Sequence, residues 1–117
     1  AVTGIAEFPV LTEQPGEFSL SQNSPNPFNP STSITYRVPG GASESSLRRA
    51  VRLAVYDVLG REVAMLVDEF REPGVNVVQF DGSTFSSGVY FYRLTTDVPG
   101  APTARHQVQT RKMVLLK

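Results

Sequence analysis

The sequence has no cysteine among its 117 residues, which excludes disulfide bonds, thiolate metal sites and cysteine nucleophiles. Eleven basic residues balance eleven acidic ones, so no net charge would draw the chain to nucleic acid or to an anionic membrane. No window approaches the roughly 20 apolar residues that span a bilayer, and the N-terminus lacks a basic region followed by an apolar run. Stability must therefore come from packing and hydrogen bonds, and any export signal must lie elsewhere.

The length fits a single domain with one modest core. Residues Ala1 to Glu17 carry Pro9, Pro15 and Gly16 without a sustained hydrophobic period, which predicts a linker that follows a preceding domain. The start at Ala1, with no initiator methionine, is consistent with a piece of a longer polypeptide. We expect the folded domain to extend from Phe18 to Lys117.

Short runs of alternating hydrophobicity, separated by turn residues, predict an all-β antiparallel sandwich of about seven strands. Gly60 and Pro73-Gly74 are typical of turns between neighbouring strands. Two polar stretches, 42–49 and 103–110, are interpreted as loops. The clearest predicted strands are Ser33–Val38, Ala50–Tyr56, Glu62–Val67, Val75–Phe80, Val89–Leu94 and Gln107–Lys117, with Ile34, Tyr36, Val38, Val51, Leu53, Val55, Val63, Met65, Val67, Val75 and Val77 expected to face the core.

The residues that could carry catalysis or bind a metal form no convincing site. His106 is the only histidine, and without cysteines it would need several carboxylates around it to hold zinc. No Gly-x-Ser-x-Gly sequence is present to position a serine nucleophile. We therefore predict no enzyme activity, no metal and no cofactor. The acidic residues follow or end strands, where they commonly solvate turns: Asp57, Asp68, Glu69, Glu72, Asp81 and Asp97.

The aromatic residues allow two interpretations. They can fill the space between two sheets about 10 Å apart, or they can form a flat sugar-binding platform. The chain has no tryptophan, the side chain with the largest stacking surface, so the core interpretation is favoured. The residues concerned are Phe80, Phe85, Tyr90, Phe91 and Tyr92.

The most unusual motif is the proline-rich stretch from Gln22 to Thr32, QNSPNPFNPST. Proline fixes φ and disfavours helix in the residue before it, and asparagine side chains can cap backbone groups in such turns. Phe28 is the only large apolar residue in the stretch. We expect a rigid loop with Phe28 buried beneath the sandwich, which is also compatible with a preformed recognition surface.

Four sequence blocks occur together in this chain: LSQNSPNPFNPST at 20–32, VYDVLGREV at 55–63, SGVYFYRL at 87–94 and RKMVLLK at 111–117. In this order they resemble the type A C-terminal sorting domain of the type IX secretion system, over about residues 18–117. Ser24, where that family often has an aromatic residue, and two longer loops, 40–49 and 97–109, depart from the family pattern.

The resemblance implies an immunoglobulin-like sandwich at the end of proteins that Bacteroidota and related bacteria send across the outer membrane. It implies recognition by the outer-membrane translocon and a cell-surface sortase-like protease that often removes the domain and attaches the cargo to the surface. Carried over from the motifs, the residues expected to act in recognition or in maintaining the fold are Asn26, Pro27, Phe28, Asn29, Pro30, Gly60, Arg61, Gly88, Val89, Tyr90, Lys112, Met113, Val114, Leu115, Leu116 and Lys117.

Three functions remain open from the sequence. The first is a sorting domain that directs attached cargo through the periplasm and outer membrane to the medium or the cell surface. The second is a carbohydrate-binding accessory module, which predicts a row of exposed aromatic residues. The third is a passive spacer, which would let the terminal residues vary freely.

Overall fold

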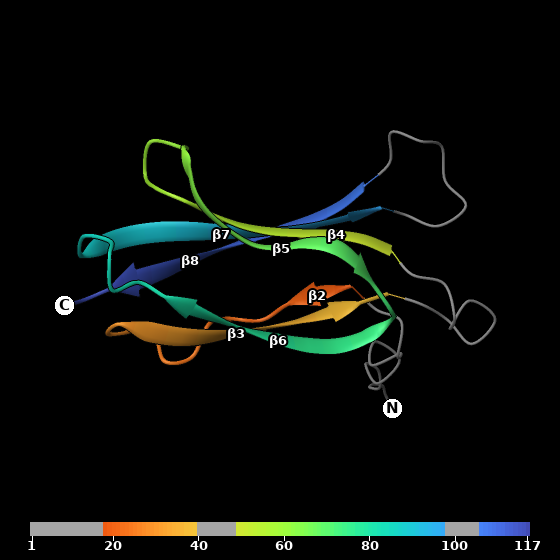
Figure 1. The fold of residues 1–117 in the computed structure, drawn as a ribbon, viewed down its shortest axis with the longest axis horizontal. Coiled ribbons are helices and arrows are strands. Elements are labelled where there is room, and N and C mark those ends of the chain that lie inside the picture. Colours follow the sequence, from red (N-terminus) through yellow and green to blue (C-terminus); the bar gives the residue numbers. More distant parts are fainter. Residues whose placement is uncertain (1–17, 40–48, 98–105) are drawn as a thin grey trace, which may run out of the picture.

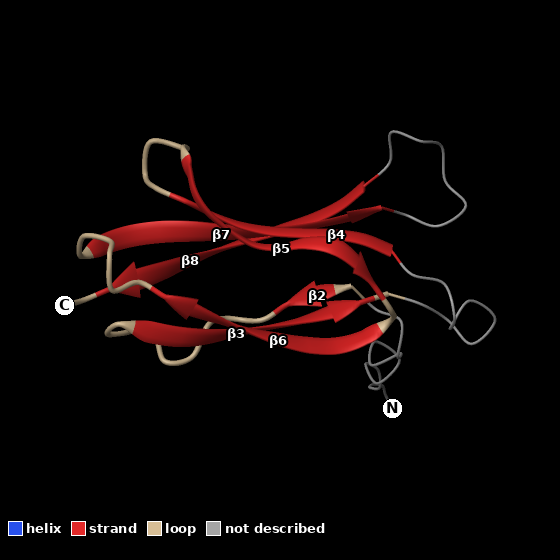
Figure 2. Ribbon diagram, viewed as in Figure 1, coloured by secondary structure: helices blue, strands red, loops and turns tan. Residues whose placement is uncertain are grey.

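The described part of the chain is an all-β sandwich of seven strands in two antiparallel sheets, as predicted (Figure 1). This computed structural model describes residues 18–39, 49–97 and 106–117. No helix occurs within these ranges, so none there is long and apolar enough to cross a membrane (Figure 2). The predicted linker 1–17 lies outside them. The immunoglobulin-like assignment within the sandwich class stays a prediction.

The larger sheet has four strands and the smaller has three, one stacked on the other (Figure 1). The larger has the order β5-β4-β7-β8, from β5 (Glu62–Arg71), β4 (Arg49–Tyr56), β7 (Gly88–Asp97) and β8 (His106–Leu115). The smaller has the order β2-β3-β6, from β2 (Ser19–Leu20), β3 (Ser31–Val38) and β6 (Gly74–Asp81).

The core lies between the sheets because alternate side chains of a strand point to the same face. Ile34, Tyr36 and Val38 of β3 are buried as predicted, and so are Val51, Leu53 and Val55 of β4. In β7, which pairs with β4 on one side and β8 on the other, Tyr90, Tyr92 and Leu94 face the core. Strand β7 is therefore an interior strand of the larger sheet.

The predicted inward face of β5 is wrong at Met65, which is 38% exposed. The pairing of β4 with β5 shifts between Leu53 and Ala54 and again between Val55 and Tyr56. Each shift leaves an extra residue in β5 and changes which side chains point inward. As a result Val67 is buried opposite Leu53, while Met65 lies opposite Ala54 on the outer face.

The predicted inward face of β6 is also wrong. Val75 and Val77 are 57% and 61% exposed, because they pair with Arg37 and Thr35 on the outer face of β3. Val78 pairs with the buried Ile34, and Phe80 is itself buried. Cross-strand partners lie on the same face of a sheet. The pairing with β3 therefore decides which valines of β6 point inward, which the sequence of β6 alone does not.

Several predicted boundaries also need correction. Arg49 begins β4 and is buried, although it was expected in a loop; residues 40–48 lie outside the described ranges. Residues 107–110, included in both the predicted loop 103–110 and the predicted strand Gln107–Lys117, belong to β8, which begins one residue earlier at His106. Strand β7 continues to Asp97, three residues past its predicted end. The last strand ends at Leu115, two residues before the predicted end.

Candidate functional site

The proline-rich loop of residues 23–30 leads from β2 into β3 and is anchored by a buried asparagine. Asn23 is 3% exposed, and its side-chain nitrogen donates to the Pro25 carbonyl at 3.1 Å and to Thr32 Oγ1 at 3.0 Å. Its backbone N–H donates to the Tyr92 hydroxyl at 2.7 Å, which donates in turn to the Ser21 carbonyl at 2.7 Å. Burial raises the pKa of Tyr92, so this hydroxyl keeps its proton at neutral pH. The loop is thus fixed to a core strand of the larger sheet.

Phe28 fills the space beneath this loop, as predicted. Its side chain is 1% exposed and meets the edge of Phe80, with ring centroids 5.9 Å apart. Phe80 stacks on Phe85 at 5.6 Å, and Phe85 meets Tyr90 at 6.0 Å. The other residues of the motif, Asn26, Pro27, Asn29 and Pro30, are exposed. The loop therefore buries its aromatic ring and Asn23 and exposes Asn26, Asn29 and its prolines.

The same loop pairs with the outer edge of β8. The Phe28 N–H donates to the Val114 carbonyl at 2.9 Å, and the Leu116 N–H donates to the Phe28 carbonyl at 3.0 Å. The Val114 N–H donates to Asn26 Oδ1 at 2.9 Å. Exposed strand edges invite pairing with other chains, and this loop covers the edge of β8 around Val114. The structure thus joins the first and last motif blocks into one surface.

The loop between β6 and β7, residues 82–87, completes this end of the sandwich. Gly82 donates its N–H to the Pro30 carbonyl at 2.8 Å. A Cβ on Gly82 would lie 3.1 Å from Leu115 Cδ2 and 3.2 Å from Phe28 Cε2, closer than side chains normally pack. Lys117 reaches the same loop, with Nζ donating to the carbonyls of Ser83 at 2.6 Å and Phe85 at 2.9 Å.

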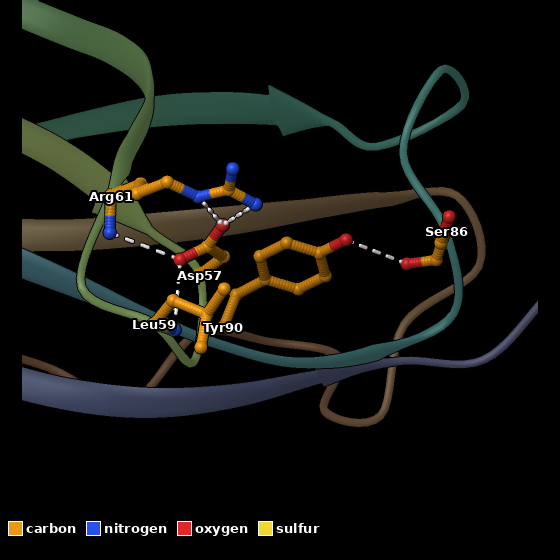
Figure 3. A network of polar contacts seen from close by, with 5 residues as sticks. All are labelled: Asp57, Leu59, Arg61, Ser86 and Tyr90. Carbon is orange, nitrogen blue, oxygen red and sulfur yellow. Dashed lines mark hydrogen bonds and ion pairs between the residues drawn. The ribbon is translucent and has the colours of Figure 1, made fainter.

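The Gly88, Val89 and Tyr90 block adjoins the last block through strand pairing. These three residues lie opposite Leu115, Val114 and Met113 of β8. The Tyr90 hydroxyl donates to the Ser86 carbonyl at 2.8 Å, as Figure 3 shows. Met113 and Leu115 are fully buried, whereas Lys112, Leu116 and Lys117 are exposed. The block at 111–117 therefore combines core residues with residues available to a partner.

The remaining predicted residues, Gly60 and Arg61, lie in the turn between β4 and β5. Gly60 has φ of 85°, the left-handed conformation predicted for it. The Asp57 carboxylate accepts hydrogen bonds from the N–H groups of Leu59 and Arg61 and pairs with the Arg61 guanidinium at 2.9 Å (Figure 3). These donors, the Arg61 N–H first, hold the pKa of Asp57 below its ordinary value. Gly60 and Arg61 thus shape their own turn.

Sequence reasoning missed several residues that assemble this site. The sequence assigns no role to Asn23, although it lies within the proline-rich motif, or to Gly82. Tyr92 was treated only as an aromatic residue, and Ser87, whose Oγ accepts the Lys117 N–H at 2.9 Å, was not considered. No local pattern marks these residues. The hydrogen bond between Ser87 and Lys117 joins residues 30 positions apart in the sequence, and the one between Tyr92 and Ser21 joins residues 71 positions apart.

The candidates for chemistry are mostly engaged in local structure. Asp57 serves its turn, Asp81 accepts the Ser83 N–H at 2.9 Å, and Glu69 pairs with Arg71 at 2.7 Å. Residues 18–39, 49–97 and 106–117 contain no group of three or more His, Asp or Glu side chains placed to hold a metal ion. Three of the five aromatic residues considered for a sugar platform, Phe80, Tyr90 and Tyr92, are buried, in agreement with the core interpretation.

Comparison with known proteins gave one family. The model of the secretion system C-terminal sorting domain matches residues 24–113, which is more than half of the chain. The match begins in the proline-rich loop and ends at Met113 in β8, so it includes the loop and stops just before Val114 and Leu116, the residues that the loop binds. No curated protein matched the sequence.

Proposed function

The chain belongs to the family of secretion system C-terminal sorting domains, and from this premise we propose that it directs attached cargo through the outer-membrane type IX translocon and to attachment at the cell surface. Membership implies export through the outer membrane, to the medium or the cell surface. The family is generally non-catalytic, and we propose the same for this chain. Its partners would be a cargo domain preceding it, the translocon and a sortase-like protease.

The observation that supports this proposal most is the pairing of the proline-rich loop with β8. Asn26 and Phe28 bind the backbone of Val114 and Leu116, so two distant motif blocks present one rigid surface. Rigid surfaces lose little conformational entropy on binding, which favours recognition. The exposed members of that surface are Asn26, Pro27, Asn29, Pro30, Lys112, Leu116 and Lys117, and we propose that the translocon reads them.

We propose that the folded domain is 18–117 and that residues 1–17 link it to the cargo. A protease needs extended, accessible backbone, so cleavage would fall before Phe18. This part of the proposal concerns residues that lie outside the described ranges.

The experiment that tests the function fuses residues Ala1 to Lys117 to a neutral reporter in a host with type IX secretion. We expect the reporter in surface and medium fractions of the wild-type host, and in the periplasm of a translocon-deficient strain. Retention of the folded fusion in the periplasm of both strains would contradict the proposal and favour a spacer or a binding module.

A matched pair of substitutions tests the terminal surface within the same assay. Leu116 and Val108 are 54% and 53% exposed, so replacing either by serine should leave the core intact. We expect Leu116→Ser to lower the exported fraction several-fold and Val108→Ser to leave it unchanged, since truncating one of the few residues that dominate a partner interface costs more than about 1 kcal/mol. Equal export of both variants would favour the passive spacer.

A further inference from the structure

The tip of the β4–β5 turn exposes two neighbouring aliphatic side chains. Val58 is 66% exposed and Leu59 is 75% exposed, although tight turns are usually built from polar residues and glycine. The turn projects beyond the larger sheet, at the end of the sandwich that carries the C-terminus (Figure 1). Both side chains are therefore left largely in contact with water.

The turn is also held rigid. Besides the contacts of the Asp57 carboxylate, the Asp57 N–H donates to the Arg61 carbonyl and the Gly60 N–H donates to the Asp57 carbonyl, both at 3.0 Å. Figure 3 shows that the Arg61 guanidinium contacts the Asp57 carboxylate within the same turn. A turn fixed in this way presents Val58 and Leu59 with little entropy left to lose on binding.

A hollow of about 180 Å³ lies at the foot of the turn. Tyr56 and Phe91, which face each other across β4 and β7, form part of its lining together with Arg93 and Thr110. The Arg93 guanidinium lies 4.8 Å from the centre of the Tyr56 ring. The hollow has room for several waters or for one side chain from another molecule. A projecting apolar tip and a hollow therefore adjoin on the outer side of the larger sheet.

Positively charged side chains outnumber negatively charged ones around the tip and the hollow. The carboxylates of Asp57 and Glu62 are paired with Arg61 and Arg52, at 2.9 and 2.7 Å. Among the described residues no ion pair involves Arg93, nor does one involve Lys112, which lies opposite Phe91. The surface thus has an excess of positive charge. A second copy of the chain would bring like charges together, whereas a partner with carboxylates would complement them.

We infer that Val58, Leu59, the hollow and the two cations Arg93 and Lys112 form one docking surface for a protein partner. That partner offers an apolar pocket bordered by carboxylates and a side chain that enters the hollow. A shaped protein surface fits a tip beside a hollow better than the featureless plane of a bilayer does. This inference rests on the proposed function, since we take the partner to be a component of the export machinery.

The test compares two double variants in the reporter fusion of residues Ala1 to Lys117. Val58→Ser with Leu59→Ser removes the apolar tip, and Val75→Ser with Val77→Ser removes a similar exposed pair from the smaller sheet. Both should melt within a few degrees of the unaltered fusion, because all four side chains are exposed. We expect the tip variant to reduce the rate of export roughly tenfold, as truncation of a central contact does, and the control to reduce it less than twofold.

A charge pair extends the test, with Arg93→Gln expected to slow export and Arg37→Gln, on the outer side of β3, expected to leave it unchanged. Unaltered export of the tip variant would overturn this inference alone, whereas failure of the unaltered fusion to be exported would overturn the proposed function as well. A dimer of the fusion in sedimentation experiments, absent from the tip variant, would also overturn the inference, because the tip would then contact a second copy of the chain. Binding of the fusion to neutral or anionic phospholipid vesicles, lost in the same variant, would assign the tip to a membrane instead.

Discussion

At the scale of single residues, Asp57 organises the β4–β5 turn through one carboxylate. Its pKa is lowered, chiefly by the hydrogen bond from the Arg61 N–H, so the folded state binds this proton less readily than the unfolded chain does. The stabilisation is therefore complete above the ordinary aspartate pKa of about 3.9 and is lost as pH falls through the lower, folded value.

This predicts how Asp57→Asn will behave. At neutral pH the variant should melt below the wild type because it loses the ion pair with Arg61 and weakens the turn. The difference should begin to shrink below the ordinary aspartate pKa of about 3.9 and should be lost as pH falls through the lower, folded pKa, where the wild-type carboxyl is also protonated. Melting temperatures between pH 7 and pH 3 check this, with the exposed Asp68→Asn as a control of equal charge. A difference that stays constant over the whole range would contradict the assigned role.

Single residues also show which features of the structure can be predicted from the sequence. Phe28 was predicted to be buried because it is the only large apolar residue in a polar, proline-rich stretch, and it is buried. The φ of Gly60 followed from the need for a tight turn. Asn23 and Gly82 gave no such signal, because their roles depend on Tyr92, Thr32 and Leu115, which only the folded chain brings near.

At the scale of elements, the proline-rich loop takes the place of a further strand beside β8. Phe28 supplies one donor and one acceptor, and the Asn26 side chain supplies a second acceptor, for the Val114 N–H. A side chain that accepts from an edge amide keeps that amide from water and from other chains.

Asn26→Ala should therefore expose the Val114 amide. We expect its hydrogen exchange to accelerate and the free energy of unfolding to fall by about 0.5–1.5 kcal/mol, the usual net value of one hydrogen bond. Asn29→Ala is the matched control, because Asn29 also precedes a proline, is exposed, and makes no side-chain hydrogen bond within the described part of the chain. Equal exchange at Val114 in both variants would show that the bond contributes nothing.

Strand faces were predictable where one pattern dominated. In β3 the apolar residues alternate without interruption, in β4 the larger aliphatic ones, Val51, Leu53 and Val55, do so, and both predicted faces were correct. In β5 the two shifts of register cannot be read from alternation, since they depend on the pairing with β4. In β6 both faces carry valine, so only the pairing with β3 decides that Val78 points inward.

At the scale of the whole molecule, Gly82 lies where the chain passes from the smaller sheet to the larger. It also lies against the first loop and the last strand, with Phe28, Pro30 and Leu115 all within 3.3 Å of a Cβ placed there. Overpacking of such a position forces neighbours out of their preferred conformations.

We expect Gly82→Ala to lower the free energy of unfolding by about 1–3 kcal/mol. Ser86→Ala, at an exposed position in the same loop, should have little effect. Denaturant titration of both variants measures the difference. Full stability of Gly82→Ala would mean that Leu115 and Phe28 move aside without cost.

The bond between Asn26 and Val114 joins positions 88 residues apart in the chain. Neither half of the presented surface can form it alone, because the proline-rich loop and the end of β8 must both be in place. A partner that binds this surface therefore recognises the folded state as well as the sequence. It would not bind a cargo protein whose sandwich domain is misfolded.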